Sequence, residues 1–179
     1  KKRKNDLTIC SKDLKDTTRI RSLTKLKTLN LSGCNSIQKL QGLEKLNFLE
    51  SIDVTDCSKL ISLQGAPNPN VFGSVSRYSS KDNPGLDVDF YNCSSLKDIT
   101  ALKGISKIRY MDLSGSSSIS KTEGLENIEI DSLSCFNFNI NMLQNLSNLK
   151  VKTLRLYESG ESGKISMKMT SFEGLKEWE

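Results

Sequence analysis

The apolar spacing of the stretch from Leu26 to Leu63 constrains the fold of this chain more than any other feature. One set of seven positions recurs 23 residues further on, and only the last of them loses its apolar residue. The first copy holds Leu26, Leu29, Leu31, Cys34, Ile37, Leu40 and Leu46, and the second holds Leu49, Ile52, Val54, Cys57, Leu60, Leu63 and Pro69. One short unit cannot bury its apolar face alone, so copies of the unit must stack on each other.

Each copy contains an alternating step, Leu29-x-Leu31 in the first and Ile52-x-Val54 in the second. Alternate side chains of a strand lie on the same face, so this step predicts a short strand in every unit. The apolar residues that follow at three-residue intervals predict a loose, helix-like return. We therefore expect an α/β solenoid that is curved, with a parallel sheet on its concave side and irregular or short helical segments on its convex side.

Related units cover most of the chain. We expect one domain over residues 1–179 with about seven units, of which the first, around Leu7-x-Ile9, is degenerate. The last clear strand is Leu154-x-Leu156, and the alternating residues near Met167 suggest a possible C-terminal cap over about 158–179.

The 23-residue repeat is interrupted after Leu63. Cys57 and Cys93 are 36 residues apart, 13 more than the unit, and all three prolines of the chain fall between them. Proline cannot donate to a strand ladder, so we expect an insertion loop over about 66–84. Its apolar residues, Val71, Phe72, Val75 and Tyr78, either pin the loop down or are exposed for a partner.

Composition excludes several classes of function. The net charge of +5 is too small to indicate nucleic-acid binding, and no run is apolar enough to cross a membrane. The chain begins with Lys, and we expect an excerpt or a processed chain. It has no His, the commonest catalytic base, and no phosphate-binding loop, so we expect no enzyme activity, no catalytic residues and no cofactor.

The five cysteines do not form a metal or disulfide pattern. Cys34, Cys57 and Cys93 occupy one repeat position, at which Ser116 stands in a later unit. Their spacing is not C-x-x-C and the total is odd, which speaks against a zinc site and against a secreted disulfide framework. We expect no metal, buried reduced thiols, and a cytoplasmic setting.

The phrases LNLSGCNSIQKL and IDVTDCSKLISL resemble the repeats of plant TIR-type nucleotide-binding leucine-rich immune receptors. Endings such as Leu40-Gln-Gly-Leu43 resemble equally the repeats of bacterial and protozoan leucine-rich proteins and of phosphatase regulatory subunits. The resemblance implies a leucine-rich repeat solenoid and a protein-protein interaction module that recognises its partner through the concave face. The alternative is a regulatory or targeting segment of a larger enzyme or of a ligase or phosphatase complex. The chain lacks the Leu-Pro step of the immune receptors and any nucleotide-binding segment.

The residue between the two core residues of each strand should project from the concave face. Asp53, Asp89 and Asp112 hold this position, and their strands would be successive, about 4.8 Å apart, if the insertion looped out cleanly. Carboxylates that close repel each other, so a basic segment of a protein partner would relieve the strain. The alternative is that Asp is simply a soluble strand residue. The candidate partner-binding residues are Asn30, Asp53, Asp56, Asp87, Asp89, Tyr91, Tyr110, Asp112, Arg155 and Tyr157.

Overall fold

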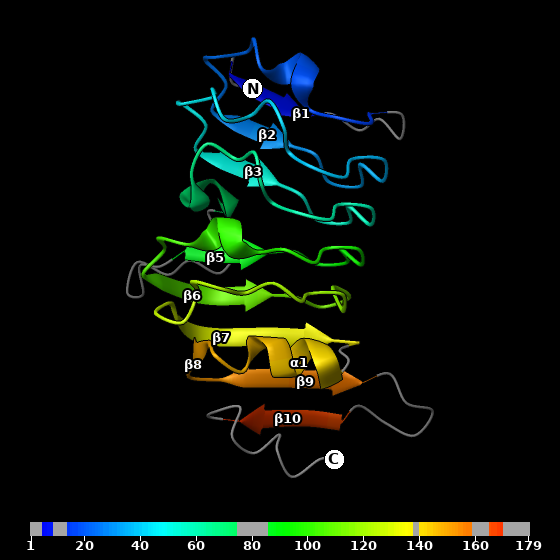
Figure 1. Cartoon of the computed structure of the whole chain (residues 1–179), viewed down its shortest axis with the longest axis vertical. Helices are drawn as coiled ribbons and strands as arrows, with labels where there is room; N and C mark the ends of the chain where they lie inside the picture. Colours follow the sequence, from blue (N-terminus) through cyan, green and yellow to red (C-terminus); the bar gives the residue numbers. More distant parts are fainter. Residues whose placement is uncertain (1–4, 9–13, 75–85, 138–139, 159–164, 170–179) are drawn as a thin grey trace.

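The chain forms a parallel β-solenoid of about six turns (Figure 1). The computed structural model describes residues 5–8, 14–74, 86–137, 140–158 and 165–169. Successive turns lie one below the other from β1 to β9, so residues 22 or 23 apart in the sequence become neighbours in space. The predicted repeat solenoid is confirmed at this level.

The strands fall into two sheets. The first has the order β1-β2-β3, formed by Asp6–Thr8, Thr28–Asn30 and Ser51–Asp53, all parallel. The second has the order β10-β9-β7-β6-β5-β4, with β8 paired to β7. Its strands are β4 (Gly73–Ser74), β5 (Leu86–Asp89), β6 (Lys107–Asp112), β7 (Glu129–Phe136), β8 (Lys150–Val151), β9 (Leu154–Glu158) and β10 (Ile165–Met169). The strands β5, β6, β7 and β9 are mutually parallel, whereas β4 and β10 run antiparallel to their neighbours.

The second core residue of the alternating step is buried in successive turns. Leu31, Val54, Phe90 and Leu113 all lie in the interior, the most exposed of them at 1%. The first core residues of the step are also neighbours, since Leu29 on β2 pairs with Ile52 on β3. One apolar cluster therefore runs through the whole stack of turns.

The return segments are mostly extended or irregular. The described residues include the short 3-10 helices η1 (Thr18–Ile20), η2 (Pro69–Phe72) and η3 (Thr100–Leu102) and one α-helix, α1 (Ile140–Leu146). Elsewhere neighbouring returns are joined by isolated parallel bridges from Ser62 to Asp98 and from Asp98 to Lys121. The apolar residues at three-residue intervals point into the core, as Ile37, Leu40 and Leu43 show.

Residues with left-handed backbone make the turns that follow β2, β3, β5, β6 and β7. Gly33, Asp56, Asn92, Gly115 and Asn137 have φ values of 75°, 59°, 57°, 75° and 55°. Only Gly, Asn and Asp adopt this conformation readily, because other side chains collide with the backbone there. The repeat therefore demands one of these three residue types at this position.

The repeated cysteines are buried, as predicted. Cys57 Sγ donates to the carbonyl of Leu31 at 3.1 Å, and Cys93 Sγ donates to that of Val54 at 3.1 Å. Ser116 does the same with its hydroxyl, which donates to the carbonyl of Phe90 at 2.6 Å. Burial raises the pKa of both Cys57 and Cys93 to about 12. The repeat position therefore calls for a small donor that satisfies a backbone carbonyl of the turn before.

The first part of the insertion does not loop out. Its segment η2 and strand β4 contact both β3 and β5, and β3 and β5 belong to different sheets (Figure 1). Val71 and Phe72 are buried, and the Phe72 ring packs edge-on against Phe90 with 5.7 Å between centroids. The alternative in which these two residues pin the loop down is thus confirmed. Val75 and Tyr78 lie outside the described residues.

The far end of the second sheet is formed by β10, which pairs antiparallel with β9. The alternating segment near Met167 therefore folds back as an added strand. The rest of the expected cap, including Trp178, falls outside the described residues. In the part of the chain that the structure describes, no helix has the length and apolar character that a membrane span requires.

Candidate functional site

The predicted row of central strand residues is present in two segments. Asp89, Asp112, Ser134 and Arg155 are paired in register across β5, β6, β7 and β9. Asn30 and Asp53 are paired in the same way across β2 and β3, and their side chains are joined by a 3.2 Å hydrogen bond. The break falls between Asp53 and Asp89, because η2 and β4 lie between their strands. The expectation of three successive aspartate strands is corrected here, since two of the three are successive.

Although the strands β3 and β5 are not paired, the turns that follow them are hydrogen-bonded to each other. The Asp56 amide donates to the carbonyl of Tyr91 at 2.9 Å, and Asn92 Nδ2 donates to Asp56 Oδ1 at 3.0 Å. Burial raises the pKa of Asp89 above its usual value, and the carboxylates of Asp112, Asp53 and Asp56 raise it further. Asp53, Asp56 and Asp112 therefore lie close enough to act on Asp89, and we call these four aspartates the acidic cluster.

Each strand aspartate also has a local role. Asp53 Oδ1 accepts the amide of Thr55 at 3.0 Å, Asp89 Oδ1 that of Tyr91 at 2.9 Å, and Asp112 Oδ1 that of Ser114 at 2.8 Å. Asn30 Oδ1 caps the amide of Ser32 in the same way. Short side chains that bond the backbone two residues on are typical of turns. Backbone capping thus explains an Asp or Asn at this position but does not require a negative charge.

Two of the three candidate tyrosines border the acidic cluster. Tyr91 is 48% exposed, next to the turn that joins β5 to its return. Tyr110 is half-buried, and its hydroxyl donates to Asp112 Oδ2 at 3.2 Å. Burial, with the nearby Asp112 carboxylate, raises the pKa of Tyr110 to about 12, so its hydroxyl stays protonated. Tyr157 belongs to β9, and its side chain lies outside the described part of the structure.

Asp87 differs from the other candidates. It is 3% exposed, and its Oδ2 contacts Nη2 of Arg109, whose side chain is itself 13% exposed. The placement of Asp87 as an open partner contact is therefore corrected: the side chain is buried because β4 pairs alongside β5 at this residue. Arg155, by contrast, is exposed on β9.

Three lysines near the sheet are bound to acids outside the acidic cluster. Lys27 pairs with Glu50 at 2.5 Å, and Asp131 pairs with Lys107 at 3.3 Å and with Lys152 at 2.7 Å. The hydrogen bond from Lys152 is the largest factor that lowers the pKa of Asp131. Among the described residues, no salt bridge reaches any member of the acidic cluster.

Sequence reasoning missed Arg109 and Asp131. In most turns two polar residues precede the second core residue of the strand, as in Arg109-Tyr110 and Asp131-Ser132. The alternating charge of Arg109, Asp131 and Lys152 at the first of these positions was the available signal.

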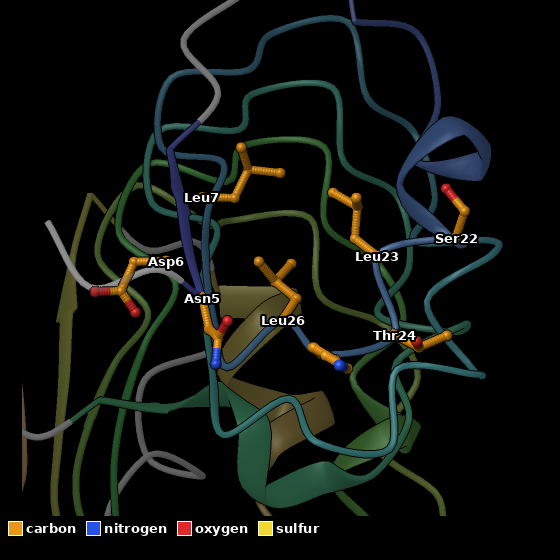
Figure 2. A pocket seen from close by; sticks show the side chains of 8 residues that line it. Asn5, Asp6, Leu7, Ser22, Leu23, Thr24 and Leu26 are labelled. Atoms are coloured by element: carbon orange, nitrogen blue, oxygen red, sulfur yellow. The ribbon is translucent and has the colours of Figure 1, made fainter.

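A shallow hollow of about 370 Å³ opens at the N-terminal end of the solenoid (Figure 2). Its lining includes Leu7, Leu23 and Leu26, together with the polar residues Asp6 and Lys25. Leu23 is 44% exposed because no turn of the described chain covers this end. The described residues also contain no group of three or more His, Cys, Asp or Glu side chains placed to hold a metal ion.

No protein-family model matches the sequence, and a search of curated proteins gives no match.

Proposed function

We propose that this chain is a leucine-rich repeat module that binds a Lys- or Arg-bearing segment of a protein partner on its sheet face. The proposal is carried by one observation: Asp53, Asp56, Asp89 and Asp112 lie together, while the salt bridges of the described residues use other acids. Such a module has no chemical step, needs no cofactor, and works in a reducing compartment such as the cytoplasm.

Electrostatics supports a cationic partner. Two carboxylates 4 Å apart repel by about 1 kcal/mol in water and by more where water is depleted. Desolvation is the largest factor that raises the pKa of Asp89, and the Asp112, Asp53 and Asp56 carboxylates add to it, although the side chain stays open to solvent. A bound ammonium or guanidinium group would remove this repulsion. The backbone of Tyr91 bonds to both Asp89 and Asp56, and its exposed ring is available for contact with the stem or head of such a side chain.

The experiment uses a fluorescent decalysine peptide as probe and a triple variant, Asp53→Asn with Asp89→Asn and Asp112→Asn. Asn keeps the capping oxygen, as Asn30 shows, so the variant removes charge without removing the turn hydrogen bonds. We expect its affinity for decalysine to fall by about tenfold at low salt, which corresponds to about 1.4 kcal/mol, and the difference to shrink as salt is added.

The matched control carries the same charge change on the return side: Glu44→Gln, Glu123→Gln and Glu126→Gln. All three glutamates are exposed, and Gln can keep the bonds that Glu44 and Glu126 accept from Gly42 and Gly124. We expect this control to bind decalysine nearly as the wild type does. Equal losses in the two triple variants would show that only net charge matters and would remove the basis for a site on the sheet face.

A further inference from the structure

Arg109 is an extra residue in the sheet ladder. Across β5 and β6, Leu86 pairs with Ile108 and Asp87 with Tyr110, so the register shifts by one residue at Arg109. Such a bulge leaves one residue unpaired and redirects its side chain. Here the guanidinium is directed onto Asp87 on the neighbouring strand.

The strand beside Arg109 carries two acids. Asp87 and Asp89 are two residues apart on β5, so they share one face of the strand and lie about 6.7 Å apart along it. Asp112, on the same strand as Arg109, is paired with Asp89. From this spacing we expect the long side chain of Arg109 to be able to reach either Asp87 or Asp89, and in the structure it bonds to Asp87.

The pair is buried but not saturated. The Asp87 and Arg109 side chains are 5% and 13% exposed. Yet Asp87 Oδ1 and Arg109 Nε find no hydrogen-bond partner among the residues that the structure describes. A saturated arginine–carboxylate pair uses two parallel bonds, and each unsatisfied buried polar atom costs stability. An incompletely bonded pair is therefore a poor solution if its role is only to stabilise the fold.

We propose that Asp87 is a positioning residue that sequesters Arg109 and so keeps the acidic cluster uncompensated and attractive to a cationic partner. This inference rests on the proposed function, because it concerns the same site. Without Asp87, Arg109 turns to Asp89 and takes the place that a partner's cation would occupy. Asp87 itself touches no partner, since it is buried.

The test measures how much Asp89→Asn weakens decalysine binding in three backgrounds. In the wild type we expect a loss of about fivefold from this single charge, roughly 1 kcal/mol. In Asp87→Asn we expect less than about twofold, because the released Arg109 already neutralises Asp89. In the double background Asp87→Asn with Arg109→Gln no guanidinium remains, and the loss returns to about fivefold.

A second readout is the titration of the Asp89 carboxyl carbon by NMR. Its pKa should fall in Asp87→Asn relative to the wild type and should recover most of that fall in the double variant. A purely structural pair would change the unfolding temperature without this pattern. If Asp87→Asn fails to fold, Asp87→Ser removes the same carboxylate and leaves a hydroxyl acceptor.

The outcomes separate the two proposals. The same factor for Asp89→Asn in all three backgrounds, with an Asp89 pKa that does not respond to Arg109, overturns the sequestration of Arg109 and leaves the proposed function standing. Absence of decalysine binding by the wild type overturns the proposed function itself.

Discussion

The strand aspartates combine two tasks within a single side chain. Each presents one oxygen to the backbone amide two residues on, as Asp112 does to Ser114 at 2.8 Å. The negative charge is a separate property, since Asn30 makes the same bond to Ser32 without a charge. Because the two tasks depend on different features of the side chain, substitution can separate them.

We predict that Asp112→Asn leaves the free energy of unfolding unchanged or raises it, because the capping oxygen remains and the repulsion from Asp89 is relieved. Asp112→Ala should lower it by about 1 kcal/mol, since the Ser114 amide then loses its acceptor. Urea denaturation of both variants measures the difference. A loss in Asp112→Asn as large as in Asp112→Ala would mean that the charge itself holds the turn.

The pH dependence of stability gives a prediction for Asp89. Its pKa is raised in the folded protein above the ordinary value of 3.8, chiefly by burial and then by the carboxylates of Asp112, Asp53 and Asp56. Between the two pKa values the folded state holds a proton that the unfolded state has lost. The contribution of Asp89 to stability is therefore present at low pH and is lost as pH rises from 3.8 through the folded value.

Asp89→Asn should remove this contribution to the pH dependence. The stability of the variant minus that of the wild type should increase as pH rises through that window and then level off. Denaturation curves at a series of pH values test it, and the subtraction cancels the acids that both proteins share. A constant difference across the window would show that Asp89 titrates normally.

At the scale of one element, the stacking of turns brings backbone close to backbone. Gly65 has a φ of 100°, and a Cβ built on it would lie 2.4 Å from the carbonyl oxygen of Leu40 in the preceding turn. Gly33 is also left-handed, with a φ of 75°, but nothing lies within 4 Å of its Cβ position. Substitution of Gly33 therefore tests the left-handed backbone alone, whereas substitution of Gly65 tests the left-handed backbone together with the close contact to Leu40.

We predict that Gly65→Ala lowers the free energy of unfolding by at least about 2 kcal/mol, because the backbone of the Leu40 turn must move. Gly33→Ala should cost about 1 kcal/mol from the left-handed conformation alone. Thermal or chemical denaturation of both gives the comparison. Equal losses in the free energy of unfolding would mean that the close contact between Gly65 and Leu40 does not restrict the backbone.

For the whole molecule, the split sheet does not divide the core. Phe72 of the insertion packs on Phe90, and the apolar cluster includes residues from both sides of the break, such as Val54 and Leu113. In a solenoid each turn depends on its neighbours, so stability is transmitted along the stack.

We predict that Val54→Ala before the break and Leu113→Ala after it each cost about 2 to 4 kcal/mol and shift one shared unfolding transition. Both side chains are almost completely buried, at 0% and 1% exposed. Calorimetry combined with circular dichroism shows whether one transition remains. Separate transitions for the two variants would mean that the break is a boundary between independent folding units.

The repeat spacing by itself determined the solenoid, its interior row and the burial of the repeated cysteines Cys34, Cys57 and Cys93. These features depend on alternation within a strand and on a fixed period, which are local properties, so Leu31 and Val54 could be placed from their neighbours in the sequence alone. The capping aspartates follow the same local logic.

Only the tertiary structure decided which strands lie side by side at the insertion. The length from Cys57 to Cys93 showed that residues had been added, but not that Val71 and Phe72 would enter the core and separate β3 from β5. That outcome depends on packing against Phe90, a contact between distant parts of the chain. Likewise Asp87 and Asp89 are equivalent by alternation, and only the bulge at Arg109 and the pairing of β4 buried one and left the other exposed.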